Sequence, residues 1–327
     1  MVTTDVRTTG AGATAVAATS RRVRRRAGKQ GTVTPKHLRA NGTAYLMIAP
    51  MVILLAVFVI WPLLHAIYLS GFEISFYKDP EFVGLQFYGY VLNDPQFWAS
   101  LWVGLQFALM MVPTGMVLAL LLATLLKNVS KRMASFLKTT IYIPAVVSSV
   151  IASVVFLFIY QDDGFANWFI SLVRLDSVAW LQDPGTALPA IAVPALWLGF
   201  GVSTLIMLAA LLDIPDSYYE SASLDGAGFW AKTRFITIPG LRNVLRFLFV
   251  TGFTLSIQEF LLPLIMTNGG PVNATTTPNL YIFNSFRDGT PYSTSFSLTA
   301  SLLLFVVLGS ISAIIFRLIS SDKAVDA

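Results

Sequence analysis

The sequence predicts an all-α membrane protein that crosses the bilayer six times and carries a pair of short helices in a cytoplasmic loop. Three observations support this prediction. Of the 327 residues, 55% are hydrophobic and only 12% are charged, whereas a soluble domain is about one quarter charged. The apolar residues form six windows long enough to cross a hydrocarbon core roughly 30 Å thick. The Lys and Arg residues gather in the loops on one side of these windows.

We expect each window to be a helix, because a backbone in lipid must satisfy its polar groups internally. Five windows contain no Asp, Glu, Lys or Arg, and the fifth in chain order contains Glu259 alone. The predicted spans are Tyr45–Ser70, Trp98–Leu126, Thr139–Tyr160, Leu188–Leu212, Phe247–Thr267 and Ser295–Phe316.

The distribution of positive charge predicts the orientation of the spans. Nine Lys and Arg residues precede the first span, four lie in Lys127–Lys138, four in Lys232–Arg246, and two follow the last span. Only Lys78, Arg174 and Arg287 lie in the remaining loops. Because positive loops stay in the cytoplasm, both termini are predicted to be cytoplasmic.

The chain is predicted to have three parts: a disordered basic tail (1–40), a six-helix membrane domain (41–320) and a short cytoplasmic tail (321–327). The arginine-rich run 21–26 is interpreted mainly as a topology determinant, with binding to anionic lipid as the alternative. There is no cysteine and there are only two histidines, so we expect no disulfide and no metal site. We also expect no nucleic acid partner, since topology accounts for the basic charge.

A polar loop, 214–242, between the fourth and fifth spans is the most informative segment. Ser217 and Glu220 fit a capping box that would begin a helix, and Asp225-Gly226 supplies a break where glycine permits positive φ. A second short helix is predicted over Phe229–Thr237, ended by Pro239. A mere connection could be far shorter, so the loop is predicted to dock on a cytoplasmic partner.

The same loop contains a near match to a phosphate-binding loop. Gly226 is followed at the expected spacing by Lys232 and Thr233, but Ala231 stands where the second glycine belongs. The segment also follows a predicted helix and not a strand. We therefore expect no nucleotide site in this chain.

Glu259 is the one acid inside a predicted span, and Pro263 removes the helical donor for its carbonyl. Such a residue usually faces a cavity or a partner. It is interpreted either as a substrate or gating group or as a paired carboxyl that holds helices together. Gln106, Ser256 and Gln258 add polar groups at membrane depth, which either contact a hydroxylated solute or bond neighbouring helices.

At the 214–242 loop, the chain resembles the membrane subunits of type I ABC importers. Their EAA loop runs approximately E-A-A-x-x-D-G-A, followed by I-x-x-P. Ser221 and Thr233 are mild departures from this pattern. The matching residues, to which the resemblance assigns coupling to an ATPase, are Glu220, Ala222, Asp225, Gly226, Ala227, Ile236 and Pro239.

The likeness extends from about Tyr45 to the end of the chain. The stretch Thr267–Thr275 resembles the T-x-G-G-P-x-N-A-T segment of F-like subunits in maltose-type permeases. The resemblance implies half of a carbohydrate path in a bacterial plasma membrane, with no enzymatic activity. It also implies four kinds of partner: a G-like second permease subunit, two ATP-binding cassette subunits that bind ATP and Mg, an extracytoplasmic solute-binding protein, and lipid.

Two alternatives remain open. One is a proton-coupled secondary carrier that uses Glu259. The other is the same ABC machine importing a solute that is not a sugar. A membrane enzyme is disfavoured because no catalytic Ser/His, paired carboxylates or metal-binding group lies near an interface.

Overall fold

The structure, a computed structural model, describes residues 36–75, 78–172 and 175–320. The chain divides into two compact units, Met1–Leu64 and His65–Ala327, which we describe separately. The predicted C-terminal tail and all but the last five residues of the predicted N-terminal tail lie outside the described residues.

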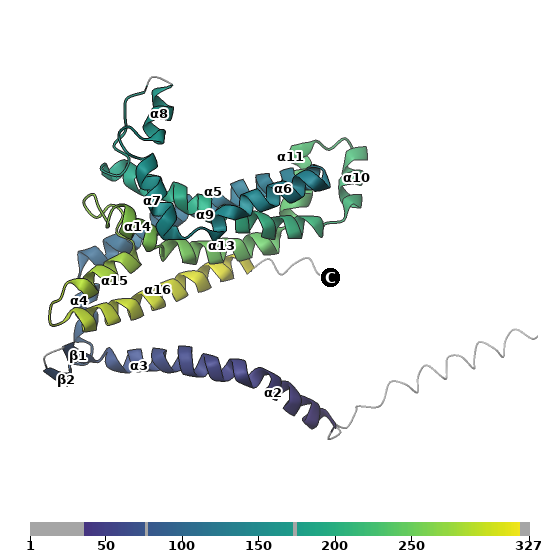
Figure 1. The fold of residues 1–327 in the computed structure, drawn as a ribbon. Helices are drawn as coiled ribbons and strands as arrows, with labels where there is room; N and C mark the ends of the chain where they lie inside the picture. The colour runs from purple at the N-terminus through teal and green to yellow at the C-terminus, as the bar shows by residue number, and fades with distance from the viewer. Residues whose placement is uncertain (1–35, 76–77, 173–174, 321–327) are drawn as a thin grey trace, which may run out of the picture. The chain divides into compact units, whose positions relative to one another are not determined.

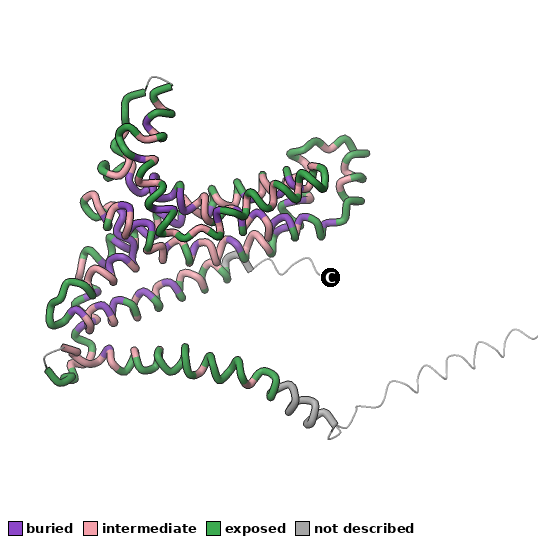
Figure 2. The backbone as a smooth tube through the Cα atoms, viewed as in Figure 1, coloured by how far each residue is buried: buried purple, intermediate pink, exposed green. Residues whose placement is uncertain are grey.

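The described part of the first unit is helical throughout, and its last helix continues past the unit's end at Leu64. Helix α2 (Lys36–Leu55) begins inside the segment predicted as tail and passes through a π turn, η1 (Ala56–Ile60), into α3 (Trp61–Leu69). Pro62 lacks an amide hydrogen and its ring clashes with the carbonyl four residues earlier. The wider π turn before it accommodates this defect. None of the apolar candidate span Tyr45–Leu69 is buried within the chain, as Figure 2 shows.

The second unit begins with the last residues of α3, from His65, and continues into a short antiparallel strand pair that the sequence did not predict, in which Phe72 lies opposite Phe82. The strand pair lies between the first two spans and leaves the membrane part helical. The elements, labelled in Figure 1, are β1 (Phe72–Ser75), β2 (Lys78–Phe82), α4 (Gln86–Leu92), α5 (Pro95–Asn128), α6 (Lys131–Tyr142), η2 (Ile143–Val146), α7 (Ser149–Ile159), α8 (Phe165–Ser171), α9 (Pro184–Leu212), α10 (Asp216–Leu224), α11 (Phe229–Lys232), η3 (Thr233–Thr237), α12 (Ile238–Gly240), α13 (Arg242–Ile257), α14 (Leu261–Met266), α15 (Pro278–Arg287) and α16 (Ser293–Ser320).

Helices α5, α9 and α13 pack side by side and form the core of this unit (Figure 1). Small residues let their backbones approach: Ala108, Ala119 and Ala123 of α5 are fully buried. On α9, Gly201 packs directly against the backbone of Ile141, where a Cβ would collide with the carbonyl oxygen. Close approach through small residues is the usual basis of helix packing in membranes.

The predicted spans are confirmed as five long apolar helices and one bent pair. The five single candidates are Tyr45–Leu69, Pro95–Asn128, Pro184–Leu212, Arg242–Met266 and Ser293–Arg317. The third window differs, because Lys131–Val146 and Ser149–Ile159 meet at 95°. Pro144 lies in the 3-10 turn η2, and Ser148 begins α7 by accepting a hydrogen bond from the Val150 amide. A proline followed by a new N-cap ends one helix and starts another.

Candidate functional site

The loop between α9 and α13 forms two helical segments joined by a tight turn, as predicted. Helix α10 ends at Leu224, and Gly226 follows with a φ of +78°. The Gly226 amide donates to the Ser223 carbonyl at 3.1 Å, and the Ala227 amide donates to the Ala222 carbonyl at 2.8 Å. This pair of bonds is a Schellman motif, in which a left-handed glycine satisfies the last carbonyls of a helix.

The predicted capping box is wrong. Helix α10 begins at Asp216, its N-cap is Pro215, and no side chain caps it. Ser217 is therefore already inside the helix, two positions after its N-cap. Asp216 instead places a carboxylate in the first turn, where it complements the positive end of the helix dipole. Glu220 lies exposed on the helix surface.

The second half of the loop is longer than predicted, because Pro239 does not end it. Helix α11 continues through the π turn η3 into α12, and the chain remains helical to Gly240. The π turn precedes this proline just as η1 precedes Pro62, and it supplies the same relief. The two halves are cross-linked: Tyr219 and Thr237 share a hydrogen bond of 3.0 Å, and Lys232 Nζ donates to Ser223 Oγ at 2.6 Å.

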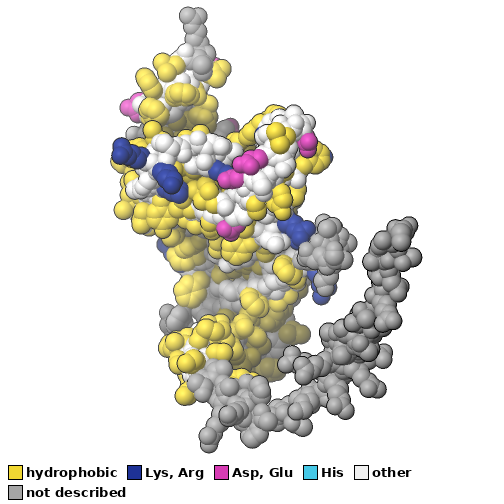
Figure 3. Space-filling model, turned by 90° about the vertical axis from the view of Figure 1, so that its right-hand side faces the viewer, with side chains coloured by type: hydrophobic (Ala, Val, Ile, Leu, Met, Phe, Trp, Pro, Cys, Tyr) yellow, Lys and Arg dark blue, Asp and Glu magenta, His cyan; other side chains and the backbone are white. Residues whose placement is uncertain are grey.

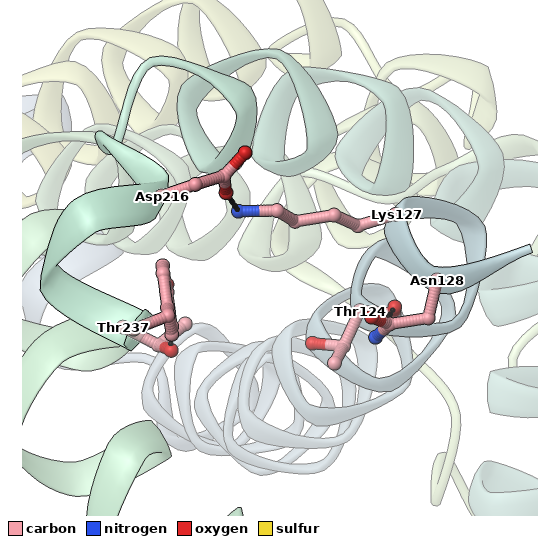
Figure 4. Close-up of polar contacts among 6 residues, drawn as sticks. Thr124, Lys127, Asn128, Asp216 and Thr237 are labelled. Carbon is pink, nitrogen blue, oxygen red and sulfur yellow. Dashed lines mark hydrogen bonds and ion pairs between the residues drawn. The ribbon is translucent and has the colours of Figure 1, made fainter. Parts of the chain in front are cut away.

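An ion pair ties this loop to the end of a core helix (Figure 4). Lys127 Nζ, in the last turn of α5, lies 2.9 Å from Asp216 Oδ1 at the start of α10. The ammonium also lies 4.4 Å from the centroid of the Tyr219 ring. The lysine side chain is 19% exposed and the aspartate 76%. Each charge also complements the dipole of its own helix, so the pair fixes one end of α10 against α5.

The loop presents large apolar side chains to its surroundings. Leu224 is 90% exposed, Trp230 79% and Phe235 73%. Beside them is a hollow of about 650 Å³ whose lining includes Ala222 and Asp225. Figure 3, viewed onto the end of the molecule that carries α10 and α11, shows hydrophobic side chains interspersed with charged ones. Such a surface is typical of an interaction site.

The structure gives the remaining predicted loop residues different roles. Ile236 packs beside the buried cluster of Leu211, Ile214 and Leu241, which fixes the loop to the ends of α9 and α13. Ala227 is half-buried, and Pro239 is exposed. No atom lies within 4 Å of where a Gly226 Cβ would be, so within this chain its φ alone requires glycine.

The fifth predicted span is broken at its acid, as the sequence indicated. Helix α13 ends at Ile257 and α14 begins at Leu261. Glu259 Oε1 accepts hydrogen bonds from the amides of Phe260, at 3.1 Å, and Leu262, at 3.3 Å. Its carboxylate therefore caps the start of α14, where the helix dipole favours negative charge.

The carbonyls freed by this break find side-chain donors from a later segment. Thr277 Oγ1 donates to the Glu259 carbonyl at 2.6 Å, and Asn279 Nδ2 donates to the Gln258 carbonyl at 2.8 Å. Buried carbonyls need such partners, because an unsatisfied one costs about 1–3 kcal/mol.

A central cavity of about 590 Å³ opens among α5, α9 and α13 beside the break. Glu259 and Ser256 both line it, as do hydroxyl groups of Ser149, Ser203 and Thr251. Among the described residues that line it, Glu259 carries the only charge. The cavity can therefore hold a polar solute against one carboxylate and several hydroxyls.

The other two predicted path residues do not join this cavity. Gln258 lines a separate hollow of about 790 Å³ bounded by α15 and α16, and Gln106 is exposed on α5. The structure thus brings together Glu259 and Ser256 only.

Sequence reasoning missed the Lys127–Asp216 pair and the donors Thr277 and Asn279. Lys127 was used only to orient the spans. Its position at the end of a long apolar helix, with an acid directly after Pro215, is the signal that could have suggested a contact. Nothing local to Thr277 or Asn279 indicates that they bond to a segment about 20 residues earlier.

Comparison with known proteins identifies relatives across most of the chain. It is 32% identical over 283 residues to the lactose transport system permease protein LacF of Rhizobium radiobacter, which covers 84% of this chain and 91% of the relative. It is 29% identical over 281 residues to the sulfoquinovosyl glycerol transport system permease protein SmoG of Agrobacterium fabrum, with 84% and 90% covered. It is also 30% identical over 246 residues to the trehalose/maltose transport system permease protein MalF of Thermococcus litoralis, with 75% and 83% covered.

The fold is shared with a bacterial ABC transporter involved in the import of the acidic polysaccharide alginate. The TM-score is 0.74 at 22% identity, and the match covers 88% of this chain and 98% of the other. Residues 89–324 match the family described as binding-protein-dependent transport system inner membrane component. Together with the apolar helices, this match confirms the predicted multi-pass transport subunit: the chain belongs to the family of binding-protein-dependent transport system inner membrane components.

Proposed function

We propose that this chain is the membrane-spanning subunit of an ATP-driven ABC importer and forms half of the path for a sugar or related carbohydrate. Family membership and relatives named for lactose, trehalose/maltose and sulfoquinovosyl glycerol support the proposal. The same membership argues against the proton-coupled carrier, as does the position of Glu259, whose carboxylate caps α14.

The observation that carries the proposal is the loop 214–242. Hydrogen bonds join its two halves and an ion pair ties it to α5, yet Leu224 and Trp230 remain exposed. A rigid element with an exposed apolar surface suits transmission of force from a partner. The partner is an ATPase subunit that binds ATP and Mg, since this chain is expected to hold no cofactor of its own.

The assembly that follows has two permease subunits, two ATP-binding cassette subunits and an extracytoplasmic solute-binding protein. A related solved complex includes an alginate pentasaccharide-bound periplasmic protein, which supports the last of these partners. The chain lies in the bacterial plasma membrane with both termini in the cytoplasm, as positive charge in its loops favours.

Within the assembly, we assign the central cavity to the solute path. Glu259 and Ser256 supply a carboxylate and a hydroxyl at the point where a span is interrupted. Interrupted spans that line a cavity are a common way to build solute sites in transporters.

The decisive experiment substitutes alanine at Gly226 and, as a matched control, at Gly228. Both sites have room for a methyl group, but φ is +78° at Gly226 and −74° at Gly228. Alanine at Gly226 is therefore strained by roughly 1–2 kcal/mol, whereas alanine at Gly228 is not.

Gly226→Ala should reduce ATP-driven saccharide uptake by the reconstituted complex while leaving membrane insertion intact, and Gly228→Ala should transport normally. Equal uptake by the two variants would refute coupling through this turn.

A further inference from the structure

A second, more polar cavity lies at the far end of α5 from the loop 214–242, which we call the coupling loop after its proposed role. It has a volume of about 420 Å³, within the range of roughly 300–1,000 Å³ for small-molecule sites. It begins at Asp94, the N-cap of α5, whereas Lys127 contacts the loop from the other end of the helix. The helix has 34 residues, and at a rise of 1.5 Å per residue it is about 50 Å long. The cavity is therefore on the opposite face of the membrane from the loop.

Its walls combine hydrogen-bonding groups with aromatic rings. Lining side chains include two carboxylates (Asp94, Asp288), three amides (Gln96, Asn273, Asn284) and two phenols (Tyr281, Tyr292). Carboxylates accept from hydroxyls, and amides both donate and accept, while ring faces stack on the C–H surface of a sugar. No Lys or Arg of the described residues lines the cavity. The neighbouring cation Arg287 lies over the ring of Phe283 instead.

Part of this wall is fixed in place by internal bonds. Tyr281 is 4% exposed and its hydroxyl donates to Asp94 Oδ2 at 2.5 Å, while Asp94 Oδ1 accepts from the Gln96 amide at 2.8 Å. Burial, with the adjacent Asp94, raises the pKa of Tyr281 far above its usual range, so the phenol keeps its proton. One side of the cavity is thus preorganised.

The same helix face that carries Tyr281 also offers groups with unused bonding capacity. Asn284 lies in α15 and Asp288, its C-cap residue, follows four positions later with helical φ and ψ, so the two lie on one face of the helix. Neither side chain forms a hydrogen bond or an ion pair with any other residue that the structure describes. Both line the cavity, so a ligand there would meet an unpaired amide and an unpaired carboxylate.

We propose that this cavity is an outer saccharide subsite, separate from the central cavity at Glu259, which takes neutral or amino sugars and rejects acidic ones. Two carboxylates with no lining cation repel a uronate and accept sugar hydroxyls. The outer placement rests on the proposed function. The subsite would receive solute before it reaches the central cavity.

The test uses the full chain in lipid nanodiscs, with maltose, trehalose and lactose as probes and glucuronate as the acidic comparison. Saturation-transfer NMR titrations give Kd for the wild type and for Asn284→Ala, Asp288→Asn and Glu259→Gln. Asp162→Asn is the matched charge control, because Asp162 is an exposed acid that lines neither cavity.

We expect a neutral saccharide to bind, Asn284→Ala and Asp288→Asn each to weaken this binding by about tenfold or more, and Asp162→Asn to leave its Kd at the wild-type value. Glu259→Gln should weaken only binding in the central cavity, which does not depend on Asn284 or Asp288. Glucuronate should not bind there. The proposal is overturned if no probe binds, or if binding is insensitive to Asn284 and Asp288 and disappears in Glu259→Gln.

Failure of the outer subsite and failure of the proposed function give different results. If the complex imports saccharide with ATP while Asn284→Ala and Asp288→Asn bind saccharide with wild-type Kd, only the outer-subsite proposal is refuted. If the complex imports no saccharide, the proposed function is refuted. Saccharide binding that depends on Asn284 and Asp288 would still establish the subsite in that case.

Discussion

At the scale of single residues, the Lys127–Asp216 ion pair joins a core helix to the loop 214–242. Its carboxylate is well exposed, so its contribution to stability is small, about 1 kcal/mol or less. The ion pair matters through its position instead, because it joins the last turn of α5 to the first turn of α10.

Lys127→Met should therefore lower uptake per ATP hydrolysed while leaving the folded protein nearly as stable as before. The matched control is Lys131→Met, which removes an exposed positive charge from the start of α6 nearby. Parallel uptake and ATPase measurements on the reconstituted complex check the prediction. Indistinguishable ratios for the two variants would show that the ion pair plays no part in coupling.

Glu259 has two roles that substitutions can separate. Glutamine retains the oxygen that accepts from Phe260 and Leu262, whereas alanine loses it. Glu259→Gln should keep the midpoint of thermal unfolding but weaken solute binding by roughly tenfold, since bonds to charged groups contribute about 1.5–3 kcal/mol. Glu259→Ala should lower the unfolding midpoint as well. Unchanged binding and turnover in Glu259→Gln would reduce the residue to a helix cap.

At the scale of elements, each interruption of a helix has a nearby chemical cause. Prolines 62 and 239 each follow a π turn, and Pro144 ends the first arm of the bent pair. The break at residues 258–260 differs, because its freed carbonyls depend on Thr277 and Asn279 from outside the helix.

Thr277→Val should destabilise the protein by about 1–3 kcal/mol, because it leaves the Glu259 carbonyl without its donor. Thr140→Val serves as the control, since that exposed hydroxyl bonds to the carbonyl of Phe136 within its own helix. Thermal unfolding in detergent should show a lower midpoint for the first variant only. A similar midpoint for both would mean that water or another group replaces the Thr277 bond.

At the scale of the whole molecule, the absence of cysteine makes the predicted topology directly measurable. A membrane-impermeant maleimide should label Asp162→Cys, between α7 and α8, on intact cells. It should label Ser217→Cys, in α10, only after the membrane is permeabilised, since positive loops are retained in the cytoplasm. Labelling of Ser217→Cys on intact cells would contradict the predicted orientation, because it would place the loop 214–242 outside the cytoplasm.

Much of this architecture is predictable because its causes are local. Apolar windows define the spans, and Asp225-Gly226 defines the turn after α10. The capping box failed for a local reason too, since Pro215 and Asp216 begin the helix before Ser217. The extension of the second helix past Pro239 was missed, because one π turn is enough to absorb a proline.

The sequence by itself determined the class of protein, the number of apolar segments and the position of the two-helix loop 214–242, and it predicted an orientation. These follow from composition, window length and charge, which need no knowledge of distant contacts. The tertiary structure decided which polar residues share a space. The sequence places four polar residues inside predicted spans: Gln106, Ser256, Gln258 and Glu259. Only Ser256 and Glu259 line the central cavity. The packing of α5, α9 and α13 through small residues sets that cavity, and such packing depends on which helix faces meet.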